Sequence, residues 1–300
     1  MSRRLALANL ALRALVKPAL ARTATPERAR RDFERIAPLF RAPPHLREIR
    51  RDGAPPLVWL SAGPVAAGRA ILWFHGGAYV AGSPRTHRGM LGRLSAEAGV
   101  EVCAPDYRLA PAGPFPAAYE DAEAAWSRLR AIGYRPGDIV LGGDSAGGGL
   151  ALALLSARLQ AGERPAAAVV FSPWIDLTLS GASLVENARA DPLLPVSRIE
   201  EVAHLVAPEA DRRDPRLSPL FAPFPAPPPV LIQVSRGEIL RDDAQRMATT
   251  LRGAGGRVTL DLWQDAPHVW QILDGWLPEA RDALRRAGGF LQSAFAETRR

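Results

Sequence analysis

The sequence predicts an α/β fold in which helices cover both faces of a mostly parallel sheet. Two observations predict it: short apolar runs alternate with helical stretches, and most of the runs are apolar throughout. Strands buried on both faces have this composition, and parallel strands need long, usually helical, crossovers between them. The 300 residues are 47% hydrophobic and 23% charged, which suffices for a large core. One α/β domain with an insertion and two domains are equally compatible with this length, and we expect a single domain spanning residues 1–300.

The elements follow one another with little else between them. The expected strands are 57–60, 70–74, 100–104, 139–141, 167–171, 230–234 and 258–262. The expected helices, located by the spacing of apolar residues, are 87–98, 117–131, 146–160, 241–253 and 278–296. Reactive groups in such sheets gather at the carboxyl ends of the strands.

Two regions interrupt this alternation. Residues 1 to about 50 are helical in pattern and rich in arginine, and residues from about 178 to 222 are irregular and rich in proline. Insertions on an α/β core usually run over the surface at the functional end. We expect the two regions to form a cap together.

The first residues resemble the start of a secretory signal, because Arg3 and Arg4 precede a leucine-rich run. Arg13 and Lys17 interrupt that run, which is too short to span a bilayer. Four apolar residues fall near one helical face: Leu5, Leu12, Val16 and Leu20. The pattern favours an amphipathic helix that packs on the protein or touches a membrane surface, without stable membrane insertion.

Charge and cysteine content indicate which partners and which cellular compartment to expect. The formal charge is +7 and the pI is near 10.5, but the excess is almost entirely arginine and we interpret it as scattered, as in a compositional bias. We therefore expect no nucleic-acid partner. The single cysteine, Cys103, lies in an apolar strand and excludes an intramolecular disulfide, which fits a cytoplasmic protein.

A nucleophile is predicted at the turn Gly143-Asp144-Ser145-Ala146-Gly147. This G-x-S-x-G motif lies between an expected strand and an expected helix. Small residues on either side let the turn close and place the Ser145 hydroxyl at the end of the sheet. The motif alone is weak evidence, because glycine and serine are common.

The expected general base is His268. A serine hydroxyl needs a base during its attack, and histidine titrates near neutrality. His268 follows the last expected strand through a short loop, which brings the imidazole to the carboxyl end of that strand. For His45, His87 and His204 we expect surface or packing roles.

A second turn, Phe74-His75-Gly76-Gly77-Ala78, leaves the strand 70–74 directly. Glycines there allow backbone N–H groups to converge on one point, and acyl transfer needs such donors for its oxyanion. We expect Gly76, Gly77 and Ala146 to supply them. Without the serine motif, a simple tight turn would be the better interpretation.

The acid that orients the histidine is expected after the strand 230–234. Glu238, Asp242 and Asp243 are the carboxylates there. Asp242 and Asp243 fall in the first turn of a helix, where a carboxylate already stabilises the helix dipole. We choose Glu238, which gives the chain order Ser145, Glu238, His268 expected of an α/β-hydrolase.

The sequence resembles the hormone-sensitive-lipase-like family of microbial α/β-hydrolase esterases from about Leu72 to the C-terminus. The motifs that carry the resemblance are His75-Gly76-Gly77, Tyr107-Arg108-Leu109-Ala110-Pro111 with Phe115-Pro116-Ala117-Ala118, Gly143-Asp144-Ser145-Ala146-Gly147, Ser172-Pro173-Trp174-Ile175-Asp176-Leu177 and His268-Val269. The resemblance implies an α/β-hydrolase fold with a helical cap, hydrolysis of carboxylic esters with short- to medium-length acyl groups, and no cofactor. Many members carry aspartate where this chain has Glu238, and Ala112-Gly113 replaces a usual Glu-His pair.

We therefore expect a serine carboxylesterase that acts through an acyl-enzyme on a small-molecule ester. A lactone hydrolase would use the same site. A non-catalytic ligand-binding relative on the same fold is a further alternative, but such receptors lack the catalytic histidine. The chain lacks the metal and nucleotide motifs H-E-x-x-H and G-x-x-x-x-G-K-[ST], so we expect no metal and no cofactor. A monomer or a homodimer would suit this function.

Overall fold

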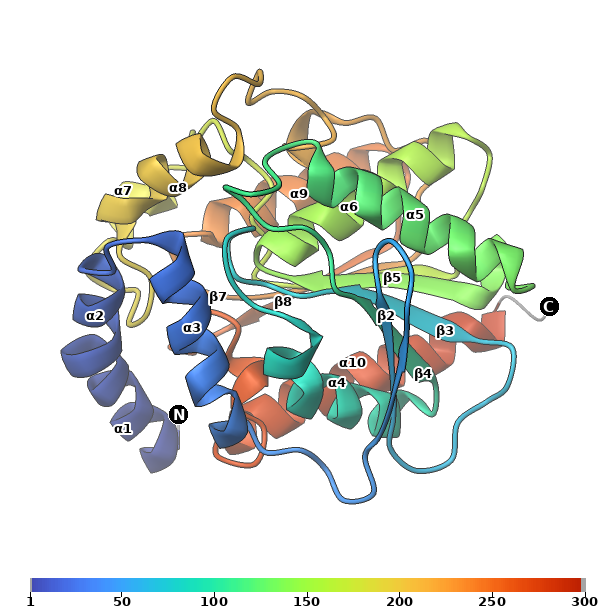
Figure 1. Ribbon diagram of the computed structural model, residues 1–300, viewed down its shortest axis with the longest axis horizontal. Helices are drawn as coiled ribbons and strands as arrows, with labels where there is room; N and C mark the ends of the chain where they lie inside the picture. The colour runs from blue at the N-terminus through green and yellow to red at the C-terminus, as the bar shows by residue number, and fades with distance from the viewer. Residues whose placement is uncertain (1, 298–300) are drawn as a thin grey trace.

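An eight-stranded sheet runs through the computed structural model, which describes residues 2–297 (Figure 1). The strand order is β1-β2-β4-β3-β5-β6-β7-β8. Two antiparallel pairs join β2 to β1 and to β4, and every other neighbouring pair is parallel. The strands are β1 (Arg47–Arg51), β2 (Leu57–Ser61), β3 (Ala70–Phe74), β4 (Glu101–Pro105), β5 (Ile139–Asp144), β6 (Ala167–Phe171), β7 (Val230–Ser235) and β8 (Val258–Trp263). The predicted mostly parallel sheet is confirmed.

Helices cover both faces of this sheet, as Figure 1 shows. One face carries α5 (Ala117–Ala131), α6 (Ala146–Gln160) and α9 (Arg241–Gly253), and the other carries α4 (Pro84–Ala98) and α10 (Pro278–Glu297). Strand β3 shows why its residues are apolar throughout: Leu72 and Phe74 enter the first core, whereas Ile71 and Trp73 enter the second. Burial on both faces thus accounts for the unbroken apolar runs.

The predicted elements agree closely with the structure, apart from β1. Strands β3 and β6 and helices α5, α6 and α9 have the predicted bounds. The sequence pattern predicts a helical N-terminal region to about residue 50, but residues 47–51 form an edge strand. All five residues of β1 are exposed and four are charged, so no apolar alternation marks the strand.

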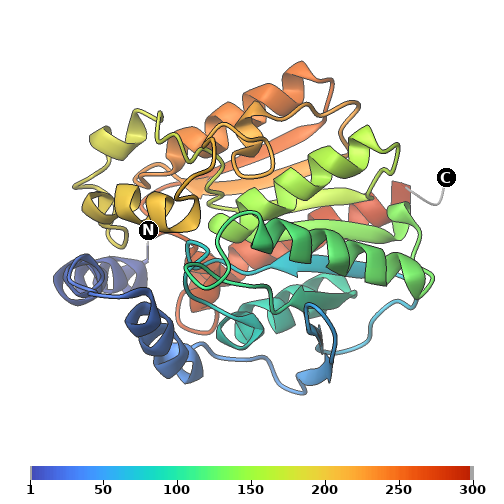
Figure 2. The ribbon, with the colours of Figure 1, turned by 45° about the horizontal axis from the view of Figure 1, so that its top comes forward.

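The two irregular regions lie beside one another at one end of the molecule, on the left of Figure 1 and Figure 2. The first contains α1 (Arg3–Ala11), which continues through a π-helical stretch, Leu12–Val16, into α2 (Lys17–Ala21), and then α3 (Pro26–Ile36). The second contains the short helices α7 (Ser183–Glu186) and α8 (Ile199–Val206). Their contacts include Arg13 Nη2, which donates to the Ala190 carbonyl over 2.6 Å, and Lys17 Nζ, which donates to those of Ala188 and Asp191.

The N-terminal helix packs as its spacing predicts. Leu5 is buried against Trp270 and Leu277, and the other three predicted residues, Leu12, Val16 and Leu20, are half-buried. Among residues 2–297, no helix combines the length and the apolar character needed to cross a bilayer.

Candidate active site

Ser145 lies in the sharp turn between β5 and α6. Its backbone adopts φ 53° and ψ −124°, an unusual conformation for a residue with a side chain. The flanking glycines are required by space: a Cβ on Gly143 would lie 2.2 Å from the Gly147 carbonyl oxygen, and a Cβ on Gly147 would lie 2.1 Å from that of Phe74. The local sequence therefore forces the serine side chain out at the end of β5.

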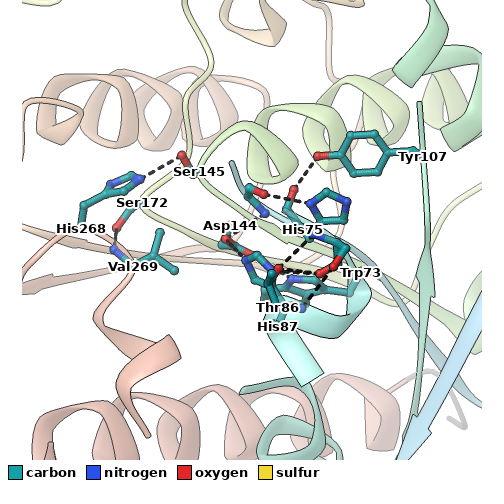
Figure 3. Close-up of polar contacts among 12 residues, drawn as sticks. Trp73, His75, Thr86, His87, Tyr107, Asp144, Ser145, Ser172, His268 and Val269 are labelled. Carbon is teal, nitrogen blue, oxygen red and sulfur yellow. Dashed lines mark hydrogen bonds and ion pairs between the residues drawn. The ribbon is translucent and has the colours of Figure 1, made fainter. Parts of the chain in front are cut away.

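His268 lies beside this hydroxyl, as Figure 3 shows. Its Nε2 is 2.9 Å from Ser145 Oγ, and its Nδ1 is 2.7 Å from Glu238 Oε2. With the proton on Nδ1, the imidazole donates to Glu238 and accepts from the serine hydroxyl. The loop after β8 brings the histidine to this position, so the three predicted residues meet at the carboxyl ends of three strands.

Glu238 is fully buried and its second oxygen is also occupied. Oε1 accepts from the Ser235 N–H over 2.7 Å and from the Ser172 hydroxyl over 2.9 Å. Ser172, which follows β6 at φ 46°, in turn accepts from the N–H of Val269, the residue after the histidine. Sequence reasoning missed Ser172, although its place directly after a strand was a usable signal.

The two alternative acids have other partners. Asp242 accepts from the Ser183 N–H and pairs with Arg241, whereas Asp243 accepts from the N–H groups of Ile175 and Asp176. Neither contacts His268 within residues 2–297. The geometry thus favours Glu238 as the partner of the imidazole.

Burial and Glu238 shift the pKa of His268 in opposite directions. Burial alone would lower the pKa of His268, but the hydrogen bond and the negative charge of Glu238 outweigh it, so the pKa lies above the ordinary 6.5. Such a pair stabilises the imidazolium that forms when histidine takes a proton.

The turn after β3, residues 74–79, which we call the oxyanion turn for its predicted role, differs from its prediction at Gly76. The Gly76 N–H donates to Asp144 Oδ2 over 3.0 Å, so it is not available to a substrate. The next two amides, Gly77 and Ala78, donate to no acceptor within residues 2–297. Both have positive φ, 121° and 56°, as does Tyr79. The turn lies close to Ser145, because a Cβ on Gly76 would lie 3.2 Å from Ser145 Cβ.

A family model for the alpha/beta hydrolase fold matches residues 71–272, which is more than half of the chain and includes all the residues above. The chain belongs to the α/β-hydrolase family. It is similar to an acetyl-hydrolase of Streptomyces hygroscopicus, with 43% identity over 231 residues and 77% of each chain covered. It is also similar to an esterase of Acinetobacter venetianus, with 35% identity over 230 residues and 76% of each chain covered.

Solved structures place this α/β-hydrolase within the bacterial hormone-sensitive-lipase group. An esterase of that group has 39% identity, a TM-score of 0.92 and coverage of 98% of this chain and 99% of the other. The structure of EstE5 has 36% identity and a TM-score of 0.94 over 99% and 100% of the two chains. The chain is therefore a hydrolase-family enzyme, and the resemblance recognised in the sequence is confirmed.

A second buried histidine–carboxylate pair lies behind the oxyanion turn of this hydrolase (Figure 3). His87 Nε2 is 3.1 Å from Asp144 Oδ2, and Asp144 Oδ1 accepts from Trp73 Nε1 over 3.0 Å. Burial alone would raise the pKa of Asp144, but His87 and Trp73 outweigh it and lower the pKa. His75 stacks on Tyr107 beside this pair, and burial together with the charge of His87 lowers its pKa to about 3.

The remaining histidines occupy the expected kinds of position. His45 and His204 are exposed, and His87 is buried as described. No cluster of three or more His, Cys, Asp or Glu side chains among residues 2–297 has the arrangement needed to hold a metal ion.

An apolar pocket lies next to the oxyanion turn. Its lining includes Tyr79 from the turn, Leu150 from the first turns of α6, and Phe115. Val206, Arg216 and Leu217 also line it, from the irregular region 178–222. Tyr79 and Leu150 could have been found from the sequence, since each follows a predicted site residue closely. Val206 and Leu217 could not, because no local pattern fixes their distance from Ser145.

Proposed function

We propose that the chain is a serine carboxylesterase in which Ser145 is the nucleophile, His268 the general base and Glu238 the orienting acid. The observation that carries this proposal is the chain of two short hydrogen bonds, 2.9 Å from His268 to Ser145 and 2.7 Å from His268 to Glu238. Base and nucleophile within hydrogen-bonding reach, with the base held by a third group, is the arrangement that activates serine.

The reaction proceeds in two halves. Ser145 Oγ attacks the ester carbonyl while His268 Nε2 takes the hydroxyl proton, and His268 then protonates the leaving alcohol. Water, deprotonated by the same nitrogen, attacks the acyl-enzyme and releases the acid together with free Ser145. Glu238 stays ionised and stabilises the imidazolium in both halves. The mechanism needs no cofactor.

The oxyanion of each tetrahedral intermediate is stabilised by the N–H groups of Gly77, Ala78 and Ala146. Ala146 is the first residue of α6, where a helix leaves its N–H without an intrahelical acceptor. Ala78 replaces Gly76 among the predicted donors, because the Gly76 N–H already donates to Asp144. The loss of one such donor typically costs about 3 kcal/mol of transition-state stabilisation.

The substrate proposal is an ester with a short- to medium-length acyl group. Its support is the similarity to relatives named acetyl-hydrolase and esterase. Residues 1–46 and about 178–222 form the proposed cap: Val206 and Leu217 of the second region line the apolar pocket, and Arg13 and Lys17 of the first region donate to carbonyl groups of the second. A lactone, a cyclic ester, would use the same groups.

A fluorophosphonate probe tests the nucleophile directly. We expect one equivalent of probe on Ser145, identified by peptide mass, and no labelling of Ser145→Ala. An unlabelled native protein would instead favour a ligand-binding relative that does not catalyse. Hydrolysis rates for p-nitrophenyl esters from acetate to palmitate, measured beside a set of lactones, test the substrate class. The proposal fails if lactones or long-chain esters are preferred over butyrate.

A further inference from the structure

The outward side of the N-terminal helix is apolar. Leu7, Leu10 and Leu15 are 67%, 65% and 69% exposed, whereas Leu5 on the inward side is buried. Five of the eleven large apolar side chains that are exposed among residues 2–297 lie within the first 39 residues. Single exposed leucines are ordinary, but a group of them on one helix marks an interaction surface. We call Leu7, Leu10 and Leu15 the leucine stripe.

Positive charge is concentrated in the same segment. The first 50 residues contain 12 Lys and Arg against 4 Asp and Glu, whereas the other 250 contain 26 against 31 − 4 = 27. The expectation of scattered charge is therefore wrong, because the whole excess belongs to the N-terminal region. Arg3 and Arg4 lie before the leucine stripe and Arg22 lies after it, and all three are exposed.

The helix is held firmly in this orientation. The Ser2 N–H donates to Glu279 over 2.7 Å, and the Asn9 amide donates to the Asp265 carbonyl over 2.7 Å. Lys17 donates to two carbonyl groups of the loop before α8, at 2.8 and 2.7 Å. The leucine stripe is thus presented outward by a fixed helix, and binding through it costs little ordering.

We propose that the continuous helical segment from α1 to α2 docks the protein on an anionic phospholipid surface. The leucine stripe enters the boundary between headgroups and acyl chains, and the surrounding arginines contact lipid phosphates. Amphipathic helices bind membranes through buried apolar area combined with attraction to anionic lipids. This inference is independent of the proposed catalytic residues, none of which lies in the segment.

The charge and the exposed leucines favour an anionic bilayer over two other partners, a second copy of the chain and a nucleic acid. A second copy docked through the same helix would bring two strongly positive segments together, which repel. A nucleic acid would neutralise the arginines but offers no apolar layer for the leucines. An anionic bilayer satisfies both features.

Vesicle co-sedimentation of the full chain tests the proposal. We expect binding to vesicles of equal parts phosphatidylglycerol and phosphatidylcholine, little binding to pure phosphatidylcholine, and weakening as salt is raised. The triple variant Leu7→Gln/Leu10→Gln/Leu15→Gln should bind at least about tenfold more weakly. Ile132→Gln, which changes a 64% exposed apolar residue outside the segment, should bind like the native chain.

Other results would overturn it. Equal binding to both vesicle types, or no binding, removes the anionic surface as partner. Undiminished binding by a triple variant with native circular dichroism removes the leucine stripe. A native dimer that the triple variant converts to a monomer, without a change in vesicle binding, identifies a second copy as the partner.

Discussion

Two buried histidine–carboxylate pairs flank Ser145, and Figure 3 shows their histidines on opposite sides of it. His268 Nδ1 lies 2.7 Å from Glu238 Oε2, and His87 Nε2 lies 3.1 Å from Asp144 Oδ2. Glu238 and His268 both follow strands and Asp144 ends one, and each carboxylate also accepts from a backbone N–H. Residue type and burial alone therefore do not distinguish the base of a reaction from a structural pair.

The remaining contacts distinguish them. The ring nitrogen of His268 that faces away from Glu238, Nε2, lies 2.9 Å from the Ser145 hydroxyl at the end of the sheet. The ring nitrogen of His87 that faces away from Asp144, Nδ1, lies 2.8 Å from the Thr86 hydroxyl inside the protein. Glu238 gives one oxygen to His268, but Asp144 shares Oδ2 between His87 and the Gly76 N–H. We infer that the first pair moves a proton and that the second fixes the backbone of the oxyanion turn.

The largest expected effect comes from removing the base. His268→Gln should lower kcat for p-nitrophenyl butyrate by roughly 10⁶-fold, as seen when a serine hydrolase loses its histidine. The loss arises because Ser145 then has no proton acceptor in reach. Steady-state assays of the purified variant, whose circular dichroism should be unchanged, measure this loss of kcat. A loss below about a hundredfold would mean that another group serves as the base.

Glu238→Gln should have the next largest effect, about 10⁴-fold in kcat, because the amide no longer holds the required tautomer or stabilises the imidazolium. Asp242→Asn is the matched control, and we expect it to stay within about threefold of the native rate, since Asp242 contacts Ser183 and Arg241 instead. A greater loss in the control than in Glu238→Gln would assign the acid to the other carboxylate.

Asp144→Asn tests the second pair. An amide cannot accept from Gly76, His87 and Trp73 as the carboxylate does, so the oxyanion turn should shift. We expect kcat to fall about tenfold to a hundredfold with KM little changed, and the protein to lose about 3 kcal/mol of unfolding free energy. Urea unfolding and steady-state kinetics give the two values. A loss of stability with native kcat would make the pair purely structural.

Much of the fold and of the first pair could be predicted from the sequence. Ser145, Glu238 and His268 each follow an apolar strand closely, so parallel topology alone brings them to one edge. The buried strands could be predicted because burial on both faces makes them apolar throughout. Edge strand β1, with five exposed residues, left no such signal.

The second pair could not be predicted, because His87 lies within α4 rather than after a strand and meets Asp144 only through the packing of α4 on the sheet. The prediction that the Gly76 N–H is an oxyanion donor was wrong for a related reason, since that N–H also has a partner that only the fold brings near it. Spacing identifies a turn with several free amides, but it does not reveal which amide already has an acceptor. Asp144, inside the serine motif itself, is that acceptor.

The smallest expected effect concerns Ser172, which links Glu238 to the backbone after His268. Since the pKa of His268 lies above 6.5 and the base must be neutral, kcat/KM should fall as pH decreases through a midpoint above that value. Ser172→Gly removes one donor from Glu238 and leaves more negative charge to attract the imidazolium. The pKa of His268 and the midpoint should therefore move to higher pH, with at most about a tenfold loss of kcat/KM at high pH.

Backbone effects need a matched control, because Ser172 has a positive φ that glycine tolerates better. Ala226 has the same φ of 46° and lies outside the site, so Ala226→Gly should leave the pH profile unchanged. A midpoint that moves equally in both variants would trace the shift to the backbone, and one that moves to lower pH in Ser172→Gly would mean that the hydroxyl does not act through Glu238. The direction of this small shift thus separates a positioning role, in which Ser172 tunes the pair, from mere packing.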